Sequence, residues 1–68
     1  MATRPTQLKI DFKGRSYSGI YSVSGDTMIA RIPGIDSRAV PVGKRTEREL
    51  ARETLTAILS AAAAERRL

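Results

Sequence analysis

Apolar and polar residues alternate strictly in three consecutive segments of this chain, and this pattern limits the fold more than any other feature. In the first segment, Leu8, Ile10 and Phe12 alternate with charged residues. Segments 16–24 and 27–32 show the same alternation. Because successive side chains of a strand point to opposite faces, such alternation is typical of half-buried β-strands. The sequence therefore predicts three neighbouring strands.

Breaks that contain glycine, at Gly14-Arg15 and Gly25-Asp26, separate the three segments. Each places Gly at the first central position of a two-residue loop, where a type II′ turn requires positive φ. With both loops, the inward-facing residues of neighbouring strands meet on one face of the sheet. The expected pairs are Phe12–Tyr17, Ile10–Gly19 and Leu8–Tyr21 across the first turn, and Val23–Met28, Tyr21–Ala30 and Gly19–Ile32 across the second. Residues 8–32 are therefore predicted to form an antiparallel β-meander.

A helix is predicted over residues 46–66. Thr46 and Glu49 match the T-x-x-E capping box that often begins a helix. The apolar residues that follow recur at helical spacing, which predicts one buried stripe. The stripe consists of Leu50, Ala51, Thr54, Leu55, Ile58, Leu59 and Ala62. Before the helix, residues 33–45 are expected to form a loop with room for a short edge strand, because Pro41 cannot donate a ladder hydrogen bond.

These elements fit one small α+β domain over residues 1–68. We predict a three-stranded antiparallel β-meander, with at most a short fourth edge strand, packed against one C-terminal α-helix. Residues 1–7 show no periodicity and are expected to be a disordered leader. A domain of 68 residues buries only roughly 60% of its unfolded surface. Since the chain contains no Cys and no His, disulfides and His-based metal sites are excluded, and self-association is the natural way to add stability.

No group of residues has the pattern of a catalytic or metal-binding site. Without His, a serine nucleophile would lack its usual base. Asp26 and Asp36 fall in predicted turns, where Asp is expected for its hydrogen bonds to the backbone. We therefore expect a protein that is not an enzyme and that needs no cofactor and no metal.

The composition also indicates where the protein is found. The start of the chain lacks the apolar run of a secretory signal, and its longest apolar stretch, 61–64, is far shorter than a membrane span. We therefore expect a cytoplasmic protein. The excess of Arg over Lys and the abundance of Ala suggest a bacterial source.

The chain is basic, with a formal net charge of +5, which favours binding to phosphate groups or to acidic proteins. A small nucleic-acid-binding protein that uses its sheet face is therefore one hypothesis, although two Tyr and one Phe are few for stacking on bases. Cations at the start of the predicted helix oppose the helix dipole, and a bound anion would remove this conflict. The candidate anion and nucleic-acid contacts are Lys13, Arg15, Arg38, Lys44, Arg45 and Arg48.

Ile20 and Ile29 fall on the sheet face that the helix is not expected to cover. Lys9 and Arg31 fall on the same face and would form a polar rim. Isolated apolar residues on a surface are common, so an ordinary solvated face is one interpretation. The other is a modest interface for another protein or for a weak homodimer.

The second half of the chain carries a short series of motifs. An Ile32-Pro33-Gly34 turn follows the third predicted strand, and Gly43-x-x-Thr46-x-x-Glu49-Leu50-Ala51 leads into an Ala-rich helix. Over roughly residues 26–62, this order resembles the N-terminal domain of HicB-like antitoxins. The resemblance implies a protein-binding role, the neutralisation of a small RNA-cleaving toxin. Our leading hypothesis is therefore a small bacterial protein-interaction module, with nucleic-acid binding as the alternative.

Overall fold

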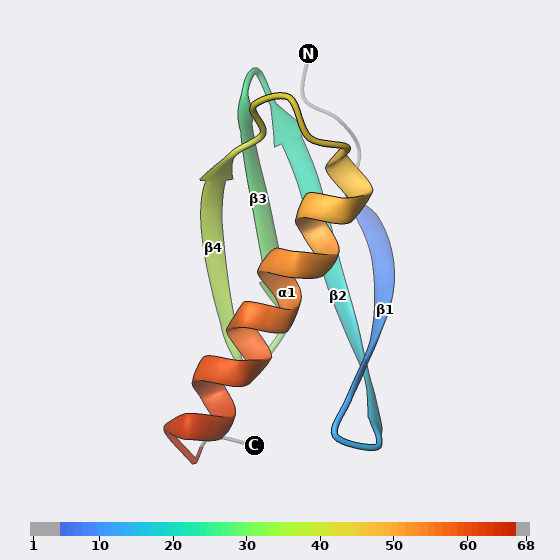
Figure 1. The fold of residues 1–68 in the computed structure, drawn as a ribbon, viewed down its shortest axis with the longest axis vertical. Coiled ribbons are helices and arrows are strands. Elements are labelled where there is room, and N and C mark those ends of the chain that lie inside the picture. The colour runs from blue at the N-terminus through green and yellow to red at the C-terminus, as the bar shows by residue number, and fades with distance from the viewer. Residues whose placement is uncertain (1–4, 67–68) are drawn as a thin grey trace.

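Four antiparallel strands and one helix make up the computed structural model, which describes residues 5–66. The elements are β1 (Thr6–Phe12), β2 (Arg15–Ser24), β3 (Thr27–Ile32), β4 (Asp36–Pro41) and α1 (Glu47–Ala64). Each strand pairs with the next one along the chain, so the order in the sheet is β1-β2-β3-β4. The helix crosses one face of the sheet diagonally (Figure 1). The predicted α+β fold, a meander packed against one C-terminal helix, is confirmed.

The sheet begins earlier than predicted, and the expected short fourth strand is present. Strand β1 begins at Thr6, so residues 6 and 7 belong to the sheet and not to a leader; residues 1–4 of that expected leader lie outside the described residues. The segment 33–45 contains β4, which pairs with β3 along its whole length. Because Pro41 is the last residue of an edge strand, its missing N–H costs no hydrogen bond within the sheet.

The first turn lies one residue earlier than the sequence indicated. Phe12 pairs with Arg15, so the two loop residues are Lys13 and Gly14. Both have positive φ, 50° and 79°, as a type I′ turn requires. The register of β1 against β2 is therefore displaced by two residues from the predicted one. A displacement of two keeps every side chain on its face, which is why the alternation alone could not detect it.

The second turn agrees with the prediction. Ser24 pairs with Thr27 across Gly25-Asp26. Gly25 has a φ of 63°, and no positive φ is found at Asp26, which matches a type II′ turn. Asp26 also ties this turn to the loop after β4. Its carbonyl oxygen accepts a hydrogen bond from the Val42 N–H at 2.7 Å, and its carboxylate accepts one from the Gly43 N–H at 3.3 Å.

Replacing Gly25 by Val is expected to lower the free energy of unfolding by about 1–3 kcal/mol, because a β-branched residue is strained at this φ. A Cβ at this position would meet nothing within 4 Å, so the loss comes from the backbone and not from a collision. Urea denaturation measures it. The control is Ser24→Val, a neighbouring exposed position in the strand, which should stay within about 0.5 kcal/mol of the unmutated protein. Equal stability of both variants would exclude the strained turn.

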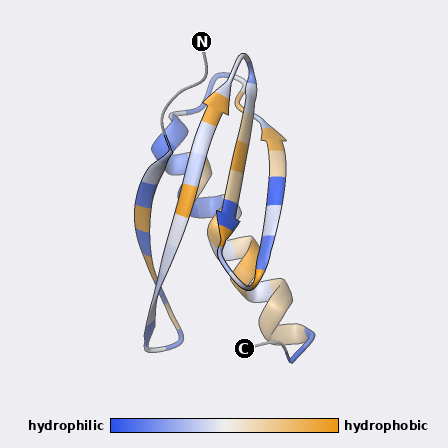
Figure 2. Cartoon of the chain, turned by 180° about the vertical axis from the view of Figure 1, so that it is seen from behind, coloured by the Kyte–Doolittle hydropathy of each residue, from blue (hydrophilic) through white to orange (hydrophobic). Residues whose placement is uncertain are grey.

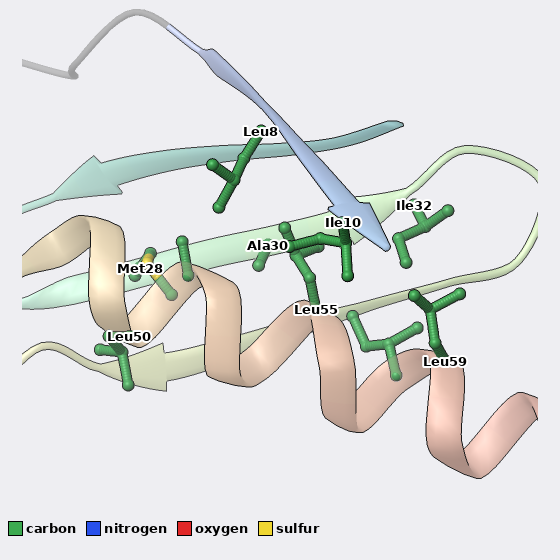
Figure 3. Packing of buried hydrophobic residues seen from close by; sticks show 10 residues of the cluster. Leu8, Ile10, Met28, Ala30, Ile32, Leu50, Leu55 and Leu59 are labelled. Atoms are coloured by element: carbon green, nitrogen blue, oxygen red, sulfur yellow. The ribbon is translucent and has the colours of Figure 1, made fainter. Parts of the chain in front are cut away.

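The core lies between the helix and one face of the sheet (Figure 3). All seven residues predicted for the buried stripe of the helix are buried. They pack against the inward-facing residues of β1 and β3, and Phe12, Tyr17 and Tyr21 lie partly buried against the same cluster. The buried residues contributed by these strands are Leu8, Ile10, Met28, Ala30 and Ile32. The core therefore uses only one face of the sheet.

The helix begins without the predicted capping box. Thr46 occupies the N-cap position and its carbonyl oxygen accepts a hydrogen bond from the Leu50 N–H at 3.0 Å, but its side chain makes no capping hydrogen bond. The helix ends at Ala64, two residues earlier than predicted. There the chain turns at Arg66, which has a φ of 59° and donates its N–H to the Ala63 carbonyl.

Gly19 lets the helix approach the middle of the sheet. It is buried in β2, and a Cβ built on it would lie only 2.5 Å from Leu55 Cδ1 and 2.8 Å from Leu55 Cδ2. The Leu55 side chain is itself fully buried. Leu55 therefore occupies the space that any larger residue at position 19 would need.

Candidate protein-binding surface

The face of the sheet opposite the helix, which we call the outer face, is not covered by any other part of the described chain (Figure 2). The register places Ile20 opposite Arg31, and Ile29 opposite both Ser22 and Ala39. Ile29 is 49% exposed, and no other large hydrophobic residue among residues 5–66 is as exposed. Ile20, which lies diagonally next to it, is half-buried. The two isoleucines thus form one apolar centre on the outer face.

Polar groups surround this apolar centre. Arg31 pairs with Ser37 on β4, and Lys9 pairs with Ser18 on β2. A shallow depression joins Arg31 to the two isoleucines, and it is lined by Pro5, Ile20, Tyr21, Ser22, Ile29 and Arg31. The structure therefore brings together three of the four residues predicted as an interface. The fourth, Lys9, lies on the same face on β1 but does not line the depression. Ala39, which extends the apolar centre across β4, was not predicted, because the short edge strand expected in its segment had no predicted register.

The six predicted anion contacts do not share one surface. Lys13 lies in the β1–β2 turn, with its Nζ 5.5 Å from the centroid of the Phe12 ring. Arg15 pairs with Phe12, and Arg38 pairs with the buried Ala30, so both project from the face that carries the helix. The remaining three, Lys44, Arg45 and Arg48, lie at the start of the helix. Lys9 and Arg31 are on the opposite, outer face.

Acidic groups partly neutralise the basic cluster at the start of the helix. Arg45 forms an ion pair with Glu53, and both side chains are largely exposed. The hydrogen bond and the charge of Glu53 raise the pKa of Arg45, and the hydrogen bond and charge of Arg45 lower the pKa of Glu53. Because the Glu53 pKa is lowered on folding, the pair stabilises the fold at neutral pH, and this contribution is lost as the pH falls through the lowered pKa. Exposed pairs of this kind contribute little to stability, but Arg45 is already engaged within the chain.

Several carboxylates form local hydrogen bonds within the sheet. Asp36 accepts a hydrogen bond from the Ser37 N–H at 2.8 Å, and Asp11 accepts one from the Ser16 hydroxyl at 2.8 Å.

In the part of the chain that the structure describes, no three Asp or Glu residues lie close enough to hold a metal ion. Over the same residues, no helix combines the length and the apolar character needed to cross a membrane.

No family model, curated protein or solved structure matches the chain.

Proposed function

We propose that this chain is a non-enzymatic protein-interaction module that binds another protein through the outer face of its sheet. The observation that supports the proposal is the exposure of Ile29, 49% of whose surface is accessible, next to Ile20 on a face that the helix does not cover. An apolar centre surrounded by polar groups is the usual anatomy of a protein interface. A small domain that buries its core on one face only can present the other face to a partner.

The partner expected for this face is an acidic protein surface with an apolar side chain at its centre. Lys9 and Arg31 flank the isoleucines, and the whole chain carries a net charge of +5, so opposite charge on the partner would guide the encounter. Ser18 and Ser22 offer hydroxyl groups between these residues. The partner class implied by the HicB-like resemblance is a small RNA-cleaving toxin, and that identity stays a prediction.

Nucleic-acid binding, the alternative hypothesis, has less geometric support. Binding to a phosphate backbone needs cations gathered along one surface. Arg15 and Arg38 instead lie on different strands of the helix side of the sheet, and the remaining candidates lie in the β1–β2 turn and around the start of the helix. Stacking on bases needs exposed aromatic rings. Phe12, Tyr17 and Tyr21 instead pack against the core on the helix side of the sheet.

Replacing Ile29 by Glu is expected to abolish partner binding while the fold is kept, because the change places a carboxylate at the centre of the apolar patch and opposite acidic groups of the partner. Tagged protein would be used to capture partners from cells that express the chain naturally. The matched control is Ser60→Glu, which also replaces a neutral side chain by a carboxylate, at an exposed position of the helix. We expect a protein that is captured by the unmutated chain and by Ser60→Glu but not by Ile29→Glu.

Two outcomes would contradict the proposal. If the same proteins are captured by Ile29→Glu and by Ser60→Glu, the outer face is not the binding surface. If only nucleic acid is captured, and a mobility shift seen at roughly 50 mM salt falls steeply as salt is added, phosphate contacts dominate and the alternative function is correct.

A further inference from the structure

The two edges of the sheet differ in how many backbone groups they leave free. Phe12 and Arg15 flank the two-residue turn between β1 and β2, and such a flanking pair exchanges its hydrogen bonds across the turn. Along an antiparallel strand, alternate residues bond to alternate sides. Gln7, Lys9 and Asp11 therefore direct their N–H and C=O groups away from β2, to the open edge of the sheet.

The same alternation at β4 gives an edge that is mostly blocked. Ser24 and Thr27 flank the second turn and bond to each other. Counted from this pair through the register of β3 and β4, the residues of β4 whose backbone groups point away from the sheet are Ser37, Ala39 and Pro41. The Ser37 N–H already donates to the Asp36 carboxylate at 2.8 Å, and Pro41 has no N–H. Only Ala39 offers a donor there, whereas β1 offers three, and β1 contains no proline of the kind that protects an edge.

We infer that the free edge of β1 is a docking surface for a second copy of the same chain, which pairs antiparallel with its own β1 around a two-fold axis at Ile10. This pairing places Lys9 opposite Asp11 of the second copy, and Asp11 opposite its Lys9. It also places Leu8 opposite Phe12 of the second copy. The two sheets then join into one continuous sheet with both helices on the same face, and the outer faces of the two copies lie side by side.

Charge complementarity selects this occupant and this register. Opposite charges directly across a strand pair are favourable, and like charges are unfavourable. An axis at Lys9 would bring two lysines together, whereas an axis at Ile10 forms two Lys–Asp pairs by symmetry. On the helix side, Phe12 is only half-buried, so contact with Leu8 of the second copy would cover apolar surface.

Space for the second copy exists beside β1. A hollow lined by Lys9, Ile10, Asp11, Arg52 and Thr56 lies along this edge, between the strand and the helix. The Asp11 carboxylate accepts one hydrogen bond from Ser16 and keeps acceptor capacity for a lysine. A contact restricted to one strand is small, so we expect a weak dimer that forms at high protein concentration.

The test is a charge exchange measured by sedimentation equilibrium over a range of protein concentrations, near 0.15 M salt, where repulsion between distant charges is screened. We expect the unmutated chain to dimerise. Lys9→Asp and Asp11→Lys should each weaken dimerisation about tenfold, because each turns two attractive pairs into two repulsive ones. The double variant Lys9→Asp with Asp11→Lys restores opposite charges and should dimerise like the unmutated chain.

Two control variants leave the charge pairs of this contact unchanged, one beside β1 and one on the opposite edge of the sheet. Ser16→Ala removes the hydrogen bond to Asp11 within the chain, and Ala39→Pro removes the free donor of β4; neither should affect dimerisation. Circular dichroism checks that each variant is folded, and if one single variant unfolds, the other decides the test.

Three results would each overturn the inference: a chain that stays monomeric at every concentration, single variants that dimerise normally, or a folded double variant that does not recover. Loss of the dimer on Ile29→Glu would instead place the contact on the outer face. Dimerisation through β1 does not require the partner protein proposed above. The failure of one proposal therefore leaves the other standing.

Discussion

Replacing Leu55 by Ala is expected to lower the free energy of unfolding by about 3–4 kcal/mol. Leu55 is fully buried at the centre of the helix–sheet contact, and truncating such a leucine removes apolar contacts and leaves a cavity. A domain of 68 residues has a total stability of about 3–10 kcal/mol. The variant should therefore lose at least about a third of that stability, which a lower midpoint of urea denaturation followed by circular dichroism would show.

The matched control for Leu55→Ala is Thr56→Ala, the next residue of the same helix. Thr56 is exposed, and its hydroxyl donates to the Arg52 carbonyl at 2.7 Å. Because Ala has the higher helix propensity and no core contact is lost, this variant should change stability by less than about 0.5 kcal/mol. A Leu55→Ala variant as stable as Thr56→Ala would mean that the helix does not pack on the sheet at this residue.

Replacing Gly19 by Ala is expected to lower the free energy of unfolding by about 1–3 kcal/mol, because the new Cβ would lie only 2.5 Å from Leu55 Cδ1 in a packed core. The φ of Gly19 is not in the left-handed region, so the backbone itself tolerates other residues there. The loss should therefore depend on Leu55. The measurement is a double-mutant cycle in urea denaturation, built from Gly19→Ala and Leu55→Ala.

In this cycle the two single losses should not add. Once Leu55 is shortened, the methyl group of Gly19→Ala occupies part of the cavity, so the double variant should be more stable than the sum of the two losses predicts. Strictly additive losses would show that Gly19 is required for a reason other than the close approach of Leu55.

The sequence predicts the strands and the helix well because their packing depends on short repeats. The alternation of Leu8, Ile10 and Phe12 identifies an inward face, and the helical spacing from Leu50 to Ala62 identifies the buried stripe; both are confirmed. The position of the first turn could not be predicted this way. A shift of two residues preserves the alternation, and a turn at Lys13-Gly14 requires a lysine at positive φ, which is uncommon.

Strand β4 was harder to predict because its residues do not alternate. Its segment, Asp36–Pro41, is largely exposed and ends in proline, and it becomes a strand because β3 offers a free edge for pairing. This pairing brings Ala39 to the outer face and turns Arg38 to the helix side. Arg38 could not be assigned to a face before the register of β4 was known.

The composition of the candidate surface was partly predictable. Ile20 and Ile29 follow from the alternation within β2 and β3, and the structure places them side by side on the outer face. The basic groups were less predictable because their surroundings depend on distant residues. Arg45 precedes the helix, yet it pairs with Glu53, which lies two turns into it. Contacts of this kind depend on how the loop enters the helix.

The architecture itself links the fold to the proposed function. The helix covers the middle of one face of the four-stranded sheet, and Gly19 allows its close approach there. The opposite face has no such cover and carries its apolar centre beside Lys9 and Arg31. The core and the proposed binding surface therefore lie on opposite sides of the same strands.

Site-directed photo-crosslinking tests the use of the outer face most directly. A photoreactive side chain would be placed at Ile29 or, as the control, at Ser60 on the exposed side of the helix, in cells that express the chain naturally. We expect a covalent adduct with a different protein from position 29 and none from position 60. Adducts with a different protein from position 60 alone, or equally from both positions, would contradict binding through the outer face.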